Sequence, residues 1–150
     1  MIRHSEKRNL PYTAEQMLHL VSDISSYPEF IPWCSDVEIK NKFTSQDSTL
    51  EILEADLLVT FKIYKEKFGS HVTVNYEECQ IKVEYLHGPF KYLLNNWKFI
   101  QNDGFCTVDF QVEFEFKSKI MQNLIGSVFN IAMKRVVSAF EKRAETLYGF

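Results

Sequence analysis

The stretch Val108-Asp-Phe-Gln-Val-Glu-Phe-Glu-Phe116 decides the fold. Each even-numbered residue in it is apolar, and each odd-numbered residue between them is an acid or an amide. Because successive side chains of a strand point to opposite faces of a sheet, this strand has one buried aromatic face and one wet face. Such alternation is typical of an antiparallel sheet that packs one face on a core and leaves the other in water.

The same alternation recurs along most of the chain and predicts a sheet of several strands. We expect strands at residues 2–10, 53–63, 68–76, 81–85 and 92–100. Glu77-Glu-Cys-Gln80 and Asn102-Asp-Gly104 have the composition of hairpin turns. Leu50 and Ile52 fall on the opposite parity from Leu53, so a β-bulge is expected near Ile52 and Leu53.

The acidic residues of these strands fall on the face opposite the apolar side chains, namely Glu54, Asp56, Asp109, Glu113 and Glu115. We expect them to meet water, where neither burial nor a neighbour adjusts a carboxyl pKa for catalysis. The sequence also contains no G-x-S-x-G, no glycine-rich phosphate loop and no H-E-x-x-H. We therefore predict no catalytic residues.

Two predicted helices complete the fold. Thr13-Ala-Glu-Gln16 has the form of a capping box and begins a helix that buries Met17, Leu18, Leu20, Val21 and Ile24. Apolar residues at spacings of three and four predict one continuous helix over about residues 118–148, roughly 45 Å long. The order of elements predicts an α+β fold in one domain, residues 1–150, with the sheet curved around the terminal helix.

The histidines and cysteines predict no metal site and no disulfide scaffold. His4, His19, His71 and His87 lie in different elements, away from ligand spacing, and we expect them at the surface. The three cysteines, Cys34, Cys79 and Cys106, are widely spaced and odd in number, which favours a reduced cytosolic compartment. Residues 1–9 lack the apolar stretch of a signal peptide, so secretion is not expected.

The charge is unevenly distributed. The chain carries −3 overall, which argues against binding DNA through a general basic field. Residues 117–150 hold six bases and two acids and so carry +4, whereas residues 1–116 carry −7. Along the predicted terminal helix, one stripe combines apolar and basic side chains: Ile120, Leu124, Ile131, Lys134, Arg135 and Lys142. Such a stripe is suited to an anionic membrane surface, while a wider sheet burying the isoleucines is the alternative.

Aromatic residues are abundant, with 13 Phe among 150 residues, and indicate either a bulky core or an aromatic-lined cavity. They are dense in the segment Tyr27-Pro-Glu-Phe-Ile-Pro-Trp33, where two prolines allow only a short helical turn or a loop. This segment can cap a core, form the lid of an apolar pocket or insert at a membrane interface. The sequence pattern leaves these three roles open.

Several motifs together resemble those of a known family. Tyr27-Pro-Glu-Phe-Ile-Pro-Trp-Cys34, preceded by Leu20-Val-Ser-Asp-Ile24, resembles the signature of the coenzyme-Q-binding START-like family of the polyketide cyclase superfamily, which includes the bacterial ribosome-association toxins. Further matching segments are Gly88-Pro-Phe-Lys91, Trp97-Lys-Phe99, Phe114-Glu-Phe116 and Ala139-Phe-Glu-Lys-Arg-Ala144. Ser25-Ser26 and His87 are mild departures. The resemblance spans essentially the whole chain.

The resemblance implies a helix-grip fold, in which a curved antiparallel sheet holds the long C-terminal helix against a hydrophobic tunnel. It implies that a ligand contacts aromatic and apolar side chains of the proline-rich segment, of the 88–90 hairpin and of the buried face. Those residues are Tyr27, Phe30, Ile31, Pro32, Trp33, Phe61, Tyr85, Phe90, Trp97, Phe110, Phe114, Val128 and Phe129. Tyr85, Asn96 and Thr60 are candidates for contacting a polar head group.

The resemblance also implies a function, the non-catalytic binding of a polyprenyl quinone, ubiquinone, in support of respiration. With the basic stripe, it predicts a cytoplasmic protein bound peripherally at the inner face of the inner membrane, with ubiquinone as its ligand and no catalytic cofactor. The first alternative is a toxin-like protein that binds the ribosome and inhibits subunit association. A second alternative is a small-molecule cyclase or hydrolase on the same fold.

Overall fold

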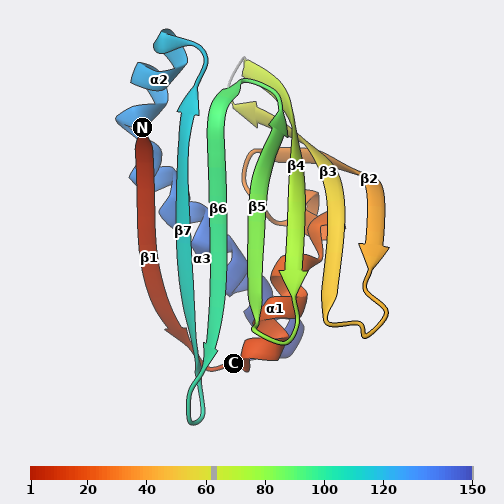
Figure 1. The fold of residues 1–150 in the computed structure, drawn as a ribbon. Coiled ribbons are helices and arrows are strands. Elements are labelled where there is room, and N and C mark those ends of the chain that lie inside the picture. The colour runs from red at the N-terminus through yellow and green to blue at the C-terminus, as the bar shows by residue number, and fades with distance from the viewer. Residues whose placement is uncertain (62–63, 150) are drawn as a thin grey trace.

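A computed structural model describes residues 1–61 and 64–149. Seven antiparallel strands form one curved sheet in the order β1-β7-β6-β5-β4-β3-β2 (Figure 1). The strands are β1 Ile2–Leu10, β2 Cys34–Thr44, β3 Leu50–Phe61, β4 Tyr64–Asn75, β5 Gln80–His87, β6 Phe90–Gln101 and β7 Cys106–Phe116. Each hairpin joins sequence neighbours, and β1 closes the sheet by pairing with β7, so the predicted antiparallel sheet is confirmed.

All helices lie on one side of the sheet, where α3 runs diagonally behind the strands (Figure 1). They are α1 Ala14–Ser22, the 3₁₀ helix η1 Ile24–Glu29, α2 Lys119–Gly126 and α3 Phe129–Tyr148. The predicted capping box is present, because Thr13 Oγ1 accepts from the Gln16 amide and Gln16 Oε1 accepts from the Thr13 amide. Within residues 1–61 and 64–149, the helices include none long and apolar enough to span a membrane.

The prediction of one continuous terminal helix over residues 118–148 is wrong. The helix breaks after Gly126, where the Val128 amide bonds to the Ile125 carbonyl three residues back, instead of to the carbonyl four residues back as in an α-helix. Glycine and serine at 126 and 127 have low helix propensity, so the break costs little. Phe129 then enters the core at the first position of α3, which ties the new helix direction to the sheet.

The strand β2 and its bulges are not anticipated by the sequence pattern. Strand β2 is an edge strand whose side chains are mostly exposed, so it shows no apolar alternation. Two register shifts lie in β2, between Cys34 and Asp36 and between Ile39 and Asn41, while β3 pairs with β4 without interruption. The bulge expected at Ile52 and Leu53 is therefore wrong in position. The expected strand end at Ile63 lies outside the described residues.

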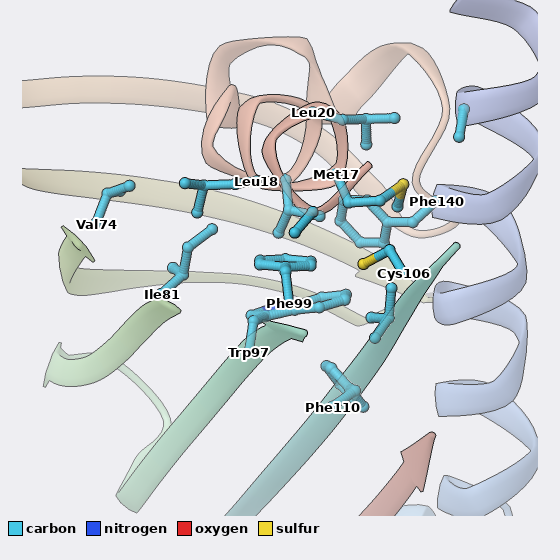
Figure 2. Packing of buried hydrophobic residues seen from close by; sticks show 14 of the residues in the cluster. Met17, Leu18, Leu20, Val74, Ile81, Trp97, Phe99, Cys106, Phe110 and Phe140 are labelled. Atoms are coloured by element: carbon cyan, nitrogen blue, oxygen red, sulfur yellow. The ribbon is translucent and has the colours of Figure 1, made fainter. Parts of the chain in front are cut away.

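The core lies between the concave face of the sheet and the helices. Figure 2 shows Met17 and Leu18 of α1, Phe140 of α3 and Trp97 of β6 directed into one interior. The Phe140 ring lies 5.0 Å from the Trp97 ring and makes an edge-to-face contact with it. A second, smaller cluster surrounds Phe90, Phe114 and Phe129 nearer to α2.

Strand β1 also places polar side chains on the inner face, beneath α3. His4 Nε2 lies 2.7 Å from Glu6 Oε1, and His4 Nδ1 lies 3.1 Å from Asn130 Oδ1. Arg8 donates to Glu6 Oε2 at 2.8 Å and to Ser138 Oγ at 3.0 Å. The expectation that His4 lies at the surface is wrong, because this network takes it under the helix, where it is buried.

Replacing Glu6 by Ala should lower the free energy of unfolding by about 2 to 3 kcal/mol, because His4 and Arg8 each lose one charged acceptor in a largely buried network. Urea unfolding followed by circular dichroism measures the change. Glu38→Ala is the matched control, since its exposed ion pair with Lys40 should contribute less than about 1 kcal/mol. Equal losses in the two variants would show that the β1 network does not stabilise the fold.

The acidic residues of the strands lie on the predicted outer face, but two of them are shielded from water. Asp56 is buried beneath His87 and Lys67, whose nitrogens lie 3.4 and 3.6 Å from its carboxylate oxygens. Asp109 is 8% exposed, and its Oδ1 has no hydrogen-bond partner among the residues that the structure describes. The expectation that these two carboxylates meet water is therefore wrong, because neighbouring side chains cover them.

Candidate ligand-binding cavity

Two apolar chambers lie between the sheet and α3. The inner chamber, of about 250 Å³, lies under η1 and the middle of the sheet. Its walls include Tyr27, Ile31, Pro32, Trp33, Cys34, Leu57, Phe68, Ser70, Val72, Ile81, Val83, Leu93, Asn95, Trp97, Phe110, Met133 and Phe140. The outer chamber, of about 190 Å³, is lined by Trp33, Val59, Phe61, Phe90, Phe114, Phe116, Ile125, Val128, Phe129, Ala132 and Met133.

The proline-rich segment forms one wall of the inner chamber. Pro28 lies inside η1, and the Tyr27 hydroxyl donates to the Val21 carbonyl, which anchors η1 to the end of α1. Trp33 has a φ of 68°, in the left-handed region that a bulky side chain seldom occupies. The Thr60 amide donates to the Trp33 carbonyl at 2.8 Å and so attaches this turn to β3.

Three polar side chains in the wall of the inner chamber, Ser70, Asn95 and Trp97, are engaged with protein atoms. The Ser70 hydroxyl donates to the Ala55 carbonyl at 3.1 Å, and the Trp97 indole donates to Asn95 Oδ1 at 3.0 Å. Asn95 in turn donates to the Gln111 carbonyl at 2.9 Å. Since these groups already have partners, the chamber favours an apolar ligand over one with many polar groups.

The thiol of Cys34 also faces the inner chamber. Burial raises the pKa of Cys34 to about 11, so the thiol stays protonated at neutral pH. Because the thiolate is the reactive form, this cysteine is a poor nucleophile. An inward-facing His4–Glu6 pair exists, but neither residue lines either chamber. In residues 1–61 and 64–149, no group of three His, Cys, Asp or Glu side chains is placed to hold a metal ion.

The structure brings together most of the residues predicted to bind a ligand. Tyr27, Ile31, Pro32, Trp33, Trp97 and Phe110 line the inner chamber, and Trp33, Phe61, Phe90, Phe114, Val128 and Phe129 line the outer one. Two predicted residues line neither chamber. Phe30 packs on Phe140 beneath the Arg143 guanidinium, and the Tyr85 hydroxyl accepts from the Phe90 amide. The role of the lining residues in binding stays a prediction.

The three head-group candidates are not grouped at the cavity. Asn96 lies on the outer face, next to Arg3 and Gln111, because it has the opposite parity from Asn95. Thr60 also has outer parity, and its hydroxyl lies 3.0 Å from Ser35 Oγ. Asn95 is the amide that lines the chamber, so the prediction chose the wrong member of the Asn95-Asn96 pair.

Several lining residues were missed by the sequence reasoning. Val72, Ile81 and Val83 line the inner chamber from β4 and β5, and Met133 lines both chambers from α3. The alternation of β4 and β5 placed the valines and Ile81 on the inner face, but it did not mark a cavity there. Met133 follows Phe129 by four residues, a helical spacing that could have identified it.

The predicted membrane-contact residues are all exposed. Ile120 is 76% and Ile131 67% exposed, and Leu124, Lys134, Arg135 and Lys142 are also exposed. The sheet therefore does not extend far enough to bury Ile120 and Ile131, and the alternative of a wider sheet is wrong. Because the helix breaks after Gly126, the residues of the stripe divide between α2, with Ile120 and Leu124, and α3, with the others; Ile125 and Val128 at the break line the outer chamber.

Comparison with known proteins gives relatives over nearly the whole chain. The ribosome association toxin RatA of Rickettsia prowazekii is 33% identical over 148 residues, 97% of each chain. The coenzyme Q-binding protein COQ10 homolog B of Xenopus laevis, a mitochondrial protein, is 32% identical over 99% of this chain and 60% of its own length. The solution structure of the 18 kDa protein CC1736 from Caulobacter crescentus matches with a TM-score of 0.82 and 33% identity over all of both chains.

A family model described as polyketide cyclase / dehydrase and lipid transport matches residues 10–141. The match covers β2 to β7, α1, α2 and most of α3, so it includes both chambers. The predicted helix-grip architecture is confirmed by the fold and by the structural similarity to CC1736. The chain therefore belongs to the polyketide cyclase / dehydrase and lipid transport family, and the START-like resemblance predicted from its motifs is confirmed.

Proposed function

We propose that this protein binds a polyprenyl quinone, ubiquinone, without catalysing a reaction on it. The observation that carries the proposal is the pair of apolar chambers, in which Ser70, Asn95 and Trp97 of the inner wall are engaged with the protein itself. The name of the COQ10 homolog B relative adds support, since that protein is called coenzyme Q-binding.

The physical reason is the cost of exposing the tail of the quinone to water. Each buried methylene contributes about 0.8 kcal/mol, so a chamber walled by Phe, Val and Leu gains affinity from the tail alone. The hydroxyl of Ser70, the amide of Asn95 and the indole N–H of Trp97 already bond to the protein, so few polar groups of the wall remain for the quinone carbonyls. Recognition therefore rests mainly on the tail.

A titration with short-tailed ubiquinone tests the proposal. Trp33 and Trp97 both line the inner chamber, so the intrinsic fluorescence should change on binding and saturate at one quinone per protein. The same ligand at a hundred times its Kd should stabilise the fold by about 2.7 kcal/mol. If added quinone changes neither the tryptophan fluorescence nor the free energy of unfolding, the proposal is wrong.

We propose that the protein reaches its ligand at a membrane, as a peripheral protein of the cytoplasmic face of the inner membrane. Ile120, Leu124 and Ile131 provide exposed apolar area, and Lys134, Arg135 and Lys142 flank it with positive charge. A lysine or arginine near an anionic surface contributes about 1 kcal/mol. The stripe lies beside the outer chamber, so docking would bring that chamber to the lipid.

The double variant Lys134→Glu, Arg135→Glu should weaken binding to anionic vesicles at least about tenfold, because two attractive charges become repulsive. Vesicle flotation with phosphatidylglycerol against neutral phosphatidylcholine measures the effect. Lys82→Glu, Lys91→Glu is the control, since both lysines are exposed on the outer face of the sheet and give the same change in charge. Equal binding by both double variants would contradict the proposed docking face.

Binding to the ribosome is a second candidate function. It is favoured by the RatA relative, whose name refers to ribosome association, and by the +4 charge of residues 117–150. The −7 charge of residues 1–116 opposes contact with RNA. Co-sedimentation with ribosomal subunits at physiological salt separates the two candidates, because a specific contact persists at that salt and a general electrostatic one declines.

A further inference from the structure

We infer that Trp33 and Met133 form a partition inside the apolar interior and thereby set the longest tail that the protein can hold. The inference rests on the proposed binding of a polyprenyl tail and specifies which tails the cavity accepts. Trp33, Val59 and Met133 line both chambers, so these side chains lie where the inner and the outer chamber adjoin.

The packing of the core divides at the same place. One cluster of buried residues surrounds Trp97, Phe110 and Phe140, and the other surrounds Phe90, Phe114 and Phe129. Met133 is half-buried and packs against both clusters. Val112 also packs against both clusters, but only Met133 of these two lines both chambers, so Met133 lies where the clusters meet and where the chambers adjoin.

Trp33 is held at this boundary by its own backbone. Its left-handed φ of 68° lies in a region that bulky residues seldom occupy, and such conformations persist where the surroundings enforce them, often at ligand sites. The Thr60 amide fixes its carbonyl to β3, and its ring meets the Phe61 ring at 5.9 Å and 76°. These contacts attach Trp33 to β3, where its side chain lines both chambers.

The second side of the partition is adaptable. Met133 has three rotatable side-chain bonds beyond Cα and no branch, so it can change its shape without moving the backbone. Most other residues of the two linings carry rings or branched aliphatic side chains, which are more rigid than methionine. The closed partition confines a tail to one chamber, and removing either side chain joins the two volumes.

A tail-length series with the intact protein tests the partition. The probes are ubiquinones with one to six isoprene units, and the readout is the Kd from tryptophan fluorescence or, for Trp33 variants, from Trp97 alone. In the wild type, affinity should rise by about fourfold for each added buried methylene until one chamber is full, and then stop rising. In Trp33→Ala and in Met133→Ala, affinity should continue to rise for at least one further isoprene unit.

Matched controls separate the partition from a simple gain in volume. Phe116→Ala removes a ring that lines only the outer chamber, and Leu93→Ala removes an aliphatic side chain that lines only the inner one. In both controls, affinity should stop rising at the same tail length as in the wild type. A small shift of the limit, no larger than the volume of the deleted side chain, is expected. The limiting tail length could be the same in the wild type and all four variants, or it could shift equally in the controls and in the partition variants. Either result would overturn the partition and leave the proposed function standing. Failure of the wild type to bind any tail length would overturn the proposed function and the partition with it.

Discussion

Replacing Val83 by Phe should weaken quinone binding by about thirtyfold or more while leaving the protein folded. Val83 lines the inner chamber from β5, where it pairs with Val72 of β4 and Asn95 of β6. A phenyl ring at this position extends into the chamber of about 250 Å³ and displaces two or three methylenes of the tail. The melting temperature should stay unchanged or rise, because the ring fills empty volume and does not displace packed side chains.

The measurement pairs a fluorescence titration with thermal unfolding of the same preparation. Leu86→Phe is the control, because Leu86 lies on the same strand and is exposed. This control should bind quinone as the wild type does. If Val83→Phe retains wild-type affinity while folded, the ligand does not occupy the inner chamber.

Replacing Phe140 by Ala should lower the free energy of unfolding by about 3 to 5 kcal/mol. Phe140 is 3% exposed, and its ring lies 5.3 Å from the rings of Tyr27 and Phe30 and 5.0 Å from that of Trp97. Its edge-to-face contacts therefore join α3 to η1 and to β6. Figure 2 shows the Phe140 ring directed from α3 into the core that contains Trp97. Its loss leaves a cavity that these three elements can only partly fill.

Urea unfolding followed by circular dichroism measures this loss. Ile131→Ala is the control on the same helix, because its side chain is 67% exposed and should change stability by less than about 0.5 kcal/mol. A loss below about 1.5 kcal/mol for Phe140→Ala would mean that α3 is held mainly by the polar network of β1 and not by this aromatic contact.

The fold was predictable from sequence where one side of an element is buried. Strand β7 illustrates this: Val108, Phe110 and Phe114 are buried, so alternation identified both the strand and its inner face. Edge strand β2 buries almost nothing and left no such pattern. The sequence pattern did not reveal the break between α2 and α3. Apolar residues keep their helical spacing across Gly126 and Ser127, from Leu124 and Ile125 to Val128 and Phe129.

The candidate site was predictable only in part, because a cavity is a property of packing and not of periodicity. The aromatic segment and the rings of β7 identified much of the wall from their composition. Alternation cannot distinguish a side chain that fills the core, such as Val74, from one that borders empty space, such as Val72. Trp33 and Met133, which both line the two chambers, are far apart in the sequence, so no local pattern identifies them as neighbours of one cavity.

The central claim, that the apolar chambers hold a quinone, is tested most directly by identifying the lipid that the protein carries. Wild-type protein and Val83→Phe are expressed in a host that makes ubiquinone and purified without detergent. Their organic extracts are then compared by mass spectrometry. We predict ubiquinone in the wild-type extract at close to one molecule per protein, and little in the Val83→Phe extract. A wild-type extract without quinone, or equal quinone in both extracts, would contradict the account.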